Sequence, residues 1–250
     1  MLKKERENEI VNILRSHDGY AEVKTLCAEM YVSESSVRRD LTRLEEKGIV
    51  NRVYGGAELV NVFSLASDFN VRRGHNSAQK QTIAKKAAKL IREGDVIFLD
   101  QSSSAFYLAR EIVSAHKCRI TVATNNIEII GLLSESSVNV ISSGGTLSRE
   151  NRTCLVGNDA QATFDGICAD RMFFSTKALS EDGVVSDCAR EEIFVRNAML
   201  RNAREKVFLC DLEKIGASAA YKQCTLGDVD YLVCEEKAEG FENFEHLKIL

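Results

Sequence analysis

The chain has 250 residues, of which 44% are hydrophobic, and a formal net charge of −4 at pH 7. This length and hydrophobic content suffice for one large or two modest packed domains and exclude an intrinsically disordered chain. Met1 to Asn8 are mainly charged and polar, and no uninterrupted apolar segment reaches membrane-spanning length. The sequence therefore predicts a soluble cytoplasmic protein with neither a secretory signal nor a membrane anchor.

The cysteines and histidines are scattered along the chain and show no metal-ligand spacing such as C-x-x-C. Several cysteines lie in apolar runs, which is typical of small buried side chains in a reducing compartment. We therefore expect no disulfide framework, no metal site and no bound cofactor. The residues are Cys27, Cys118, Cys154, Cys168, Cys188, Cys210, Cys224, Cys234, His17, His75, His116 and His246.

The first part of the chain shows helical spacing of apolar residues. Ile10 to Leu14 predict a helix that starts near Lys3 and ends at Asp18-Gly19. A second apolar set predicts a short helix from Ala21 to Met30. After a turn at Tyr31-Val32, Ser33 is a good N-cap for a third helix, which runs to Lys47 and is stopped by Gly48.

The third helix has an apolar face formed by Val37, Leu41 and Leu44. Its opposite face carries hydroxyl groups and arginines, which suit phosphate oxygens and guanine edges. Arginines alone would equally fit an ordinary solvated helix face, and the acidic net charge does not indicate a nucleic-acid binder. The two short helices, the tight turn and a following β-hairpin at residues 49–59 favour a winged helix-turn-helix. The exposed face comprises Ser35, Ser36, Arg38, Arg39, Thr42 and Arg43.

This region closely resembles the helix-turn-helix signature of the DeoR family of bacterial regulators. The resemblance is carried by Val32 to Leu41 (VSESSVRRDL), by Leu44-Glu45 and Gly48, and by Arg52 to Ala57 (RVYGGA). It implies that residues 1–60 bind double-stranded operator DNA. The DNA-binding residues expected from it are Ser33, Ser35, Ser36, Arg38, Arg39 and Arg43, with Arg52 and Tyr54 on the wing.

Residues 61–76 show no helical or strand periodicity, and we interpret them as a linker. The periodic patterns resume in a larger domain at residues 77–250. Apolar residues between Ile83 and Ile91 predict a helix from Ser77 to Arg92. Short apolar runs then alternate with helical stretches, which predicts a mostly parallel α/β sheet covered on both faces. These runs begin at Val96, Ile120, Val138, Met172, Lys206 and Tyr231.

The predicted strands end on polar or glycine residues. Ligands of open α/β sheets bind over the carboxyl edge, so one pocket can receive all of these loops. Ser102 to Ser104 precede a helix whose N-terminus attracts anions, which favours a phosphate site over N-capping by a single serine. Lys177, Lys206 and Lys214 can add positive charge, whereas Asp100 and Asp211 can accept hydrogen bonds from sugar hydroxyls. The loops are Asp100–Ser104, Thr124–Asn126, Ser142–Gly145, Ser175–Lys177, and Asp211 with Lys214.

The larger domain also resembles the DeoR family, in its effector-sensing domain. The resemblance is carried by Asp100 with Ser102–Ser104, Thr124-Asn125, Gly144-Gly145, Gly157, Glu191-Glu192, and Asp211 with Lys214 and Gly216. It implies a fold like that of ribose-5-phosphate isomerase and, as effector, a phosphorylated sugar or a related metabolite. The effector-binding candidates are Asp100, Ser102, Ser103, Ser104, Thr124, Asn125, Gly144, Gly145, Lys177, Glu191, Asp211 and Lys214.

Two other functions fit parts of the sequence. An aldose–ketose isomerase would use Glu191 or Glu192 with Asp211 as base and Lys177 to stabilise an enediolate, but it has no need of a winged helix. A DNA-architectural protein would leave the polar strand ends unexplained. We therefore predict a repressor of carbohydrate-metabolism genes that is not an enzyme. We expect a homodimer or homotetramer, because one small recognition helix makes too few base contacts for specificity.

Overall fold

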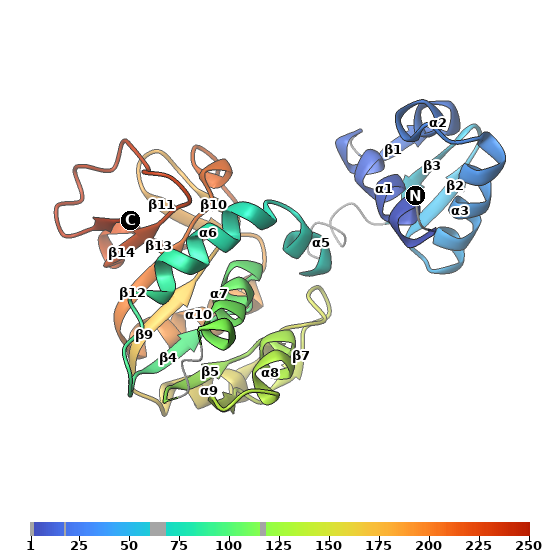
Figure 1. Ribbon diagram of the computed structural model, residues 1–250. Coiled ribbons are helices and arrows are strands. Elements are labelled where there is room, and N and C mark those ends of the chain that lie inside the picture. Colours follow the sequence, from blue (N-terminus) through green and yellow to red (C-terminus); the bar gives the residue numbers. More distant parts are fainter. Residues whose placement is uncertain (1–2, 18, 61–68, 116–118) are drawn as a thin grey trace. The chain divides into compact units, whose positions relative to one another are not determined.

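Three helices and a three-stranded antiparallel sheet form the N-terminal part of the chain (Figure 1). The strands pair in the order β1-β3-β2, and Ile10, Leu26 and Val37 are fully buried among the helices. This arrangement is the predicted winged helix-turn-helix, with one additional strand. The elements are α1 (Lys3–Ser16), β1 (Tyr20–Glu22), α2 (Val23–Met30), α3 (Glu34–Glu46), β2 (Val50–Val53) and β3 (Gly56–Leu59).

The additional strand, β1, takes up the first residues of a predicted helix. We expected this helix to begin at Ala21, but Ala21 pairs with Ala57 of β3 and α2 begins at Val23. Ala21 is buried because it pairs with β3. The helical spacing of apolar residues therefore could not show that Ala21 belongs to a strand. Where β1 meets β3, a Cβ on Gly56 would lie 2.5 Å from the carbonyl oxygen of Ala21, so the close approach requires glycine.

The computed structural model describes residues 3–17, 19–60, 69–115 and 119–250. The chain divides into two compact units, residues 1–67 and 68–250. Residues 61–68 of the predicted linker, together with His116 and Cys118, lie outside the described residues. The rest of the predicted linker contains α5 (Phe69–Gly74), and its Phe69 is buried against Phe106 with the ring centroids 5.6 Å apart.

A seven-stranded parallel sheet forms the centre of the second unit. Its order is β15-β14-β12-β9-β4-β5-β6, so β4 lies between β9 and β5. All six apolar runs expected from the sequence form strands of this sheet, and the edge strand β15 was not expected. The strands are β4 (Val96–Leu99), β5 (Thr121–Thr124), β6 (Asn139–Ser142), β9 (Ala169–Phe174), β12 (Ala203–Leu209), β14 (Tyr231–Val233) and β15 (Lys248–Ile249).

Helices cover both faces of this sheet, because successive side chains along each strand point to opposite faces. Ile97 and Leu99 pack toward the helices α5 to α8, whereas Phe98 packs toward α9 and α10. Figure 1 shows α6, α7 and α8 together on one face. The helices are α6 (Ser77–Ala88), α7 (Ser103–Ser114), α8 (Ile127–Ser134), α9 (Asn158–Asp165) and α10 (Arg190–Asn202).

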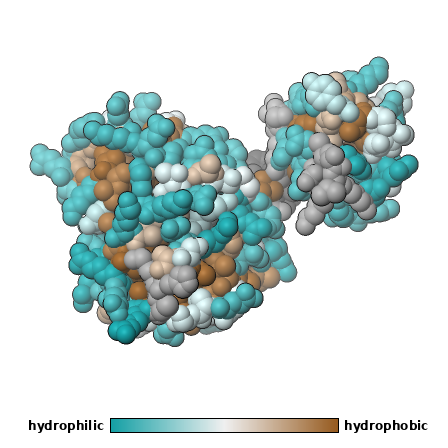
Figure 2. Space-filling view, in the orientation of Figure 1, coloured by the Kyte–Doolittle hydropathy of each residue, from teal (hydrophilic) through white to brown (hydrophobic). Residues whose placement is uncertain are grey.

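Several shorter elements follow the carboxyl ends of strands of the large sheet. A small antiparallel sheet has the order β10-β11-β13, and β7 pairs with β8. None of the helices in the described ranges has the length and apolar character needed to cross a membrane. The face drawn in Figure 2 is mainly hydrophilic, with hydrophobic residues showing between the polar ones. The shorter elements are β7 (Thr146–Leu147), β8 (Leu155–Val156), β10 (Ala178–Leu179), β11 (Val184–Asp187), η1 (Leu212–Lys214), β13 (Tyr221–Thr225) and η2 (Leu226–Asp228).

Candidate functional site

The third helix of the first unit, α3, buries Val37, Leu41 and Leu44 as the spacing predicted. Its outward residues Ser35, Arg38 and Arg39 are exposed, and Ser36 is half-buried. Ser33 is the N-cap residue, but its hydroxyl contacts the hydroxyls of Ser35 and Ser36 at 3.1 and 3.0 Å and does not cap a backbone N–H. The N-terminal turn of α3 therefore presents a cluster of three hydroxyl groups.

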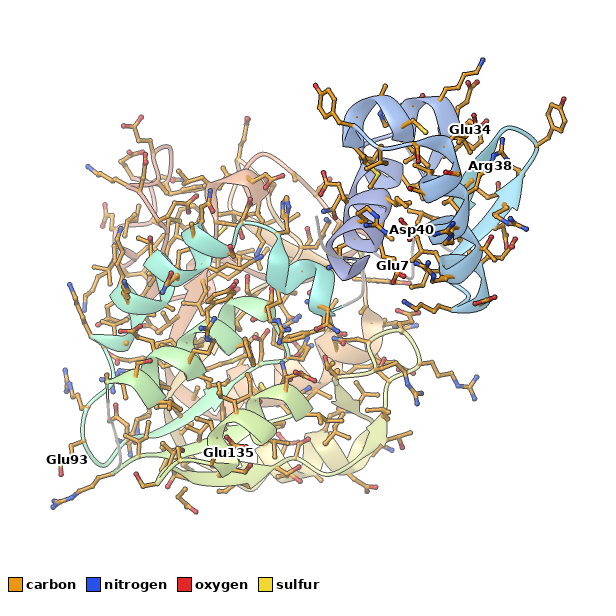
Figure 3. The ribbon with its side chains drawn as sticks, turned by 45° about the vertical axis from the view of Figure 1, so that its right-hand side comes forward. Glu7, Glu34, Arg38, Asp40, Glu93 and Glu135 are labelled. Atoms are coloured by element: carbon orange, nitrogen blue, oxygen red, sulfur yellow. The ribbon has the colours of Figure 1, made fainter. Side chains whose placement is uncertain are left out.

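The arginines of this surface differ in how firmly they are held. Arg38 donates to Glu34 one turn earlier at 2.6 Å (Figure 3). On the wing, Arg52 donates to Glu45 at 2.7 Å and to Thr42 at 3.0 Å. Within the described part of the chain, the side chain of Arg39 makes no ion pair. Arg39 is therefore the arginine most readily available to an incoming phosphate or base.

Arg43, which the sequence predicted on the exposed arginine face, is only partly exposed. Its guanidinium donates to Asp40 at 2.6 Å and lies 3.7 Å from Glu7 of α1. Asp40 is 1% exposed and also accepts from Arg6 of α1 at 2.9 Å. Figure 3 shows Glu7 and Asp40 facing each other between the two helices. Because its main partners are these acidic side chains, Arg43 joins α3 to α1.

The wing is the β2–β3 hairpin, with Tyr54 and Gly55 at its turn. The Tyr54 side chain is fully exposed. Glu45 fixes the wing on α3, because it accepts both the backbone N–H of Arg52 at 3.0 Å and its side chain. These bonds hold the pKa of Glu45 below its usual range. Arg52 is therefore oriented beside Thr42 at the outer edge of the helix.

The serine loop of the second unit joins β4 to α7. Ser102 is the N-cap, and its hydroxyl accepts the backbone N–H of Ala105 at 3.1 Å. N-capping alone thus explains Ser102, as the alternative to a phosphate site requires. Ser104 is 1% exposed, and its hydroxyl has no hydrogen-bond partner among the described residues. A second, unsatisfied hydroxyl therefore lies in the first turn of the helix.

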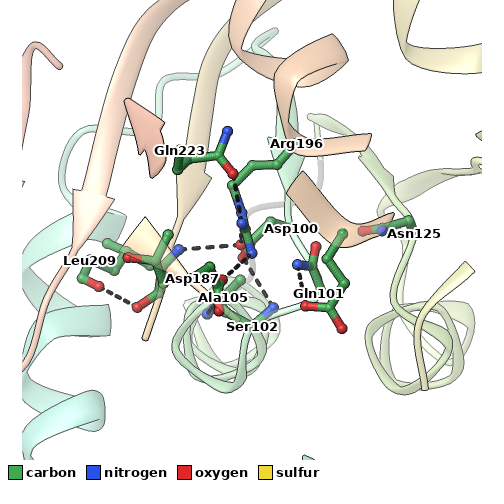
Figure 4. A network of polar contacts seen from close by, with 12 residues as sticks. Asp100, Gln101, Ser102, Ala105, Asn125, Asp187, Arg196, Leu209 and Gln223 are labelled. Atoms are coloured by element: carbon green, nitrogen blue, oxygen red, sulfur yellow. Dashed lines mark hydrogen bonds and ion pairs between the residues drawn. The ribbon is translucent and has the colours of Figure 1, made fainter. Parts of the chain in front are cut away.

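Asp100 organises the loops of the sheet edge around a buried arginine (Figure 4). It is fully buried, and its oxygens accept the backbone N–H groups of Ser102 at 3.1 Å and Ser175 at 3.3 Å. Arg196 of α10 donates to Asp100 at 3.0 Å and pairs with Asp187 at 3.1 Å. These contacts engage both oxygens of the carboxylate that was expected to accept bonds from a sugar, and they join the loops after β4 and β9 to α10.

Lys214 and Asp211 come together in the loop after β12, as predicted. The ammonium of Lys214 lies 2.9 Å from Asp211 and donates to the Ser175 hydroxyl at 2.8 Å. Burial acts to raise the pKa of Asp211, but the Lys214 cation and its hydrogen bonds hold it below the usual value. Lys206 lies inside β12, before the strand ends, and is not part of these loops.

The loops after β5 and β6 contribute amide and backbone groups. Thr124 and Asn125 are fully buried. The Thr124 hydroxyl accepts the backbone N–H of Asn126 at 3.1 Å, and Asn125 donates to the carbonyl of Leu155 at 3.1 Å while its own Oδ1 has no partner among the described residues. Gly144 and Gly145 are exposed and have positive φ. A Cβ on Gly145 would lie 2.6 Å from the carbonyl oxygen of Val156, so glycine is required there.

Lys177 and Glu191 are exposed. Glu192, one residue further, is 6% exposed and accepts from Gln101 at 2.8 Å and from Asn151 at 2.9 Å. Burial raises the pKa of the Glu192 carboxyl, and the Arg72 cation opposes that shift. Glu191 and Glu192 both line a small cavity with Ser148, Glu150, Cys188, Ala189, Arg190 and Tyr221.

Comparison with known protein families assigns both units. The DeoR-like helix-turn-helix domain matches residues 6–62, and the DeoR C terminal sensor domain matches residues 75–236. The chain belongs to the DeoR family.

Proteins named as transcriptional regulators or repressors resemble the chain over nearly its whole length. The HTH-type transcriptional regulator GolR of Listeria innocua is 31% identical over 93% of this chain and 91% of its own. The lactose phosphotransferase system repressor of Staphylococcus aureus is 31% identical over 98% of both chains. The uncharacterised regulator YgbI of Escherichia coli is 30% identical over 94% of this chain and 91% of its own.

Among solved structures, ribose-5-phosphate isomerase A of Methanocaldococcus jannaschii aligns with a TM-score of 0.43 and 19% identity. The alignment covers 56% of this chain and 55% of that one. The translation initiation factor eIF-2B of Pyrococcus horikoshii aligns with a TM-score of 0.46 and 14% identity over 94% of this chain and 82% of that one.

For this DeoR-family chain, two cations on α5 and α6 were missed by sequence reasoning. Arg72 of α5 has a buried Nε with no partner among the described residues. Lys80 of α6 is 4% exposed and donates to the carbonyls of Arg72 at 2.6 Å and His75 at 2.5 Å. Burial and the Lys214 cation lower the pKa of Lys80 to about 8. Arg72 lies within the predicted linker. Only the recognition that Phe69 packs against another apolar side chain could have indicated a helix there, and with it Arg72.

Proposed function

We propose that this DeoR-family chain is a transcriptional repressor of carbohydrate-metabolism genes whose operator binding is controlled by a phosphorylated sugar. The observation that supports the ligand class is a group of buried polar atoms without partners at the sheet edge. Among the described residues these include Ser104 Oγ, Asn125 Oδ1 and Gln101 Oε1. Buried polar groups in folded proteins normally have partners, so an edge with several free ones suits a polar ligand.

The phosphate of such a ligand fits the N-terminus of α7. The helix dipole and the free N–H groups of its first turn favour an anion, and the Ser104 hydroxyl can donate to it. Three cations lie around the same edge: Lys214 beside Ser175, Arg72 on α5 and Lys80 on α6. A phosphate carries the charge and the acceptor oxygens that these donors require.

The sugar part fits the remaining free atoms. Asn125 Oδ1 and Gln101 Oε1 can only accept hydrogen bonds, so a phosphate cannot satisfy them. Hydroxyl groups can, because each donates one proton. Gly144, Gly145, Asp211 and Thr124 belong to neighbouring loops, and we assign to them the shaping of the pocket. Lys177 and Glu191 we place at its outer rim, because both are exposed.

The DNA-binding role rests on α3 and the wing. Ser33, Ser35 and Ser36 present hydroxyls for phosphate oxygens, Arg38 and Arg39 reach toward base edges, and Arg52 and Tyr54 contact the backbone from the wing. Two copies bound to a palindromic operator would double the number of base contacts, so we propose a cytoplasmic homodimer or homotetramer. The DeoR-family relatives named as regulators or repressors support this role.

Two measurements test the proposal. A thermal-shift screen of pentose and hexose monophosphates should raise the melting temperature with at least one compound, because a ligand that binds only the native state stabilises it. A mobility-shift assay with DNA from upstream of the chain's own gene should show a complex that this compound dissociates. A stable complex that no sugar phosphate in the screen affects would contradict the proposed control.

An isomerase assay on the same compounds tests the alternative function. Glu192, with its raised pKa, is the side chain best suited to act as a base. Both of its oxygens, however, already accept hydrogen bonds from Gln101 and Asn151. We propose that Glu192 orders the pocket and that the chain is not an enzyme. Turnover of the compound that binds best would overturn this part of the proposal.

A further inference from the structure

Gln101 is a buried amide whose hydrogen-bonding groups are only half satisfied (Figure 4). The residue is 1% exposed, and its Nε2 donates to Glu192 at 2.8 Å. Its Oε1 has no hydrogen-bond partner among the described residues. A buried amide oxygen that lacks a donor costs about 1–3 kcal/mol of stability, so this arrangement favours a ligand that supplies one.

The direction of this amide is fixed by a chain of hydrogen bonds that starts at Thr153. The backbone N–H and the hydroxyl of Thr153 both donate to Asn151 Oδ1, at 3.3 and 2.8 Å. The Asn151 amide nitrogen is therefore turned to Glu192, and it donates to Oε1 of that carboxylate at 2.9 Å. Because an ionised carboxylate only accepts hydrogen bonds, Gln101 presents its nitrogen to Oε2 of Glu192 and directs its own oxygen away from it.

Solvent has little access to this chain of hydrogen bonds. Asn151 is 2% exposed and Glu192 is 6% exposed. A half-turn of the Gln101 amide would place its oxygen against the oxygen of a carboxylate, which is unfavourable in a buried site. The free oxygen of Gln101 is therefore a fixed feature of the folded chain.

Gln101 lies at the sheet edge to which the effector is assigned. Asn126, in the loop after β5, donates to the backbone carbonyl of Gln101 at 3.2 Å and so joins the loops after β4 and β5. Asn125 has the second free amide oxygen, and its direction is also fixed, because its nitrogen donates to the carbonyl of Leu155 at 3.1 Å. Ser104, with its unpartnered hydroxyl, follows Gln101 by three residues. Two acceptors of fixed direction therefore lie on neighbouring loops at this edge.

We propose that Gln101 sets the sugar specificity of the effector site by accepting a hydrogen bond from one sugar hydroxyl, and that Glu192 is the positioning residue that fixes the direction of this contact. The inference rests on the function proposed above. A compound with hydrogen or fluorine in place of that hydroxyl leaves Oε1 buried without a donor. For this reason, sites that hydrogen-bond a hydroxyl discriminate strongly against analogues that lack it.

Two variants test the direction of the Gln101 amide. Gln101→Met replaces the amide by an apolar group of similar length. In Glu192→Gln, the new amide keeps its oxygen toward Asn151, so its nitrogen faces Gln101 and turns that side chain until a donor faces the sugar. Gln81→Met, at an exposed position of α6, is the matched control.

Binding is measured by isothermal titration calorimetry. The compounds are glucose 6-phosphate and ribose 5-phosphate, each with its 2-deoxy, 3-deoxy, 2-deoxyfluoro and 3-deoxyfluoro analogues. The quantity compared is the ratio of the dissociation constants of two compounds on the same protein, because a general loss of affinity cancels in this ratio.

We expect wild type and Gln81→Met to bind at least one deoxy analogue, and the matching deoxyfluoro analogue, about tenfold or more weakly than the parent sugar phosphate. Gln101→Met should bind that deoxy analogue and the parent within about threefold of each other, since no buried acceptor is left without a donor. In Glu192→Gln, the deoxyfluoro analogue should bind more tightly than the deoxy analogue, because fluorine can accept a hydrogen bond but cannot donate one.

Wild type that binds every analogue as tightly as its parent, or Gln101→Met that keeps the wild-type ratio, overturns the role of Gln101. A deoxyfluoro analogue that binds to Glu192→Gln no better than the deoxy analogue overturns the positioning role of Glu192. Failure of the wild type to bind either parent compound would instead refute the proposed function.

Discussion

Arg39 and Arg43 are four residues apart on α3, yet their surroundings give them different roles. Arg39 is exposed without an ion pair among the described residues, whereas Arg43 pairs with buried Asp40. We expect Arg39→Ala to weaken operator binding by roughly tenfold or more, because a bidentate arginine–base contact is worth about 1–3 kcal/mol. Its melting temperature should stay close to that of wild type.

Arg43→Ala should show the opposite pattern. Its main loss is structural, because Asp40 and Glu7 are left with fewer cationic partners between α1 and α3. We expect a lower melting temperature of the N-terminal unit, measured by circular dichroism. An Arg43→Ala protein as stable as wild type, with operator affinity lost, would return Arg43 to the DNA-binding surface.

Arg196 is the most deeply engaged charge in the second unit. It is 1% exposed and contacts Asp100, Asp187 and Gln223. Arg196→Met would leave two carboxylates without their cation, which costs about 3–5 kcal/mol of unfolding free energy when the charges are buried. Urea unfolding measures this loss. Arg201→Ala, which removes an exposed pair with Asp165, is the matched control and should change stability by less than about 1 kcal/mol.

Lys80 should make stability depend on alkaline pH. Its folded-state pKa, about 8, lies below the usual lysine value of 10.5, so the unfolded chain binds the proton more tightly. The contribution of Lys80 to stability therefore rises with pH between about 8 and 10.5, and below about 8 it is unfavourable and does not change with pH. Relative to Lys80→Met, wild type should gain on the order of 2 kcal/mol between pH 7 and 9.5. Equal pH slopes in the two proteins would show that Lys80 keeps its normal pKa.

At the scale of elements, the periodic spacing of apolar residues was sufficient to predict most of the fold. The inward face of α3 and six strands of the parallel sheet follow from spacing, because each depends on neighbours within the same element. Three-residue β1 and two-residue β15 were missed, since strands this short have no periodicity to detect. Their existence depends on pairing with distant residues.

Only part of the candidate site could be predicted from the sequence. Strand ends correctly brought Asp100, Ser102, Asp211 and Lys214 to one edge. The sequence named Glu191 as an effector-binding candidate, whereas the neighbouring Glu192, four residues before Arg196, lies on the buried face of α10. Asp40 lies three residues before Arg43 on the same helix, so that pair could have been expected, whereas the contact with Glu7 could not, since Glu7 lies on another helix.

The helix α5 gives a prediction about domain boundaries. Phe69 is 2% exposed and stacks edge-on against Phe106. A fragment of residues 68–250 should therefore be more stable than one of residues 77–250, by about 3 kcal/mol or more, the usual cost of deleting a buried phenylalanine. Chemical denaturation of both fragments measures the difference. Equal stability would mean that the second unit begins at Ser77, as the linker composition suggested.

At the scale of the whole molecule, the proposed DNA-binding surface and the proposed effector site lie in units with separate cores. Mutations in one site should therefore leave the other site functional. The variant Ser104→Ala removes the unpartnered hydroxyl donor near the proposed phosphate, and Lys214→Met removes charge but keeps the apolar stem. Both should bind sugar phosphate at least tenfold more weakly and still bind the operator, so that the ligand no longer releases DNA. Anisotropy titrations of the operator complex measure this. Full ligand sensitivity in both variants would refute the pocket assignment.

The separate cores also have a genetic consequence. A missense change in the core around Phe98 or Phe208 disrupts the second unit but leaves every core contact of the first unit intact. Alleles altered after residue 68 should therefore fall into two phenotypic classes. Changes that only block the effector pocket should give dominant, permanently silenced target genes, because the altered chains still occupy the operator. Changes that destroy the second core should be recessive, because a lone DNA-binding unit has too few contacts to compete with intact repressor.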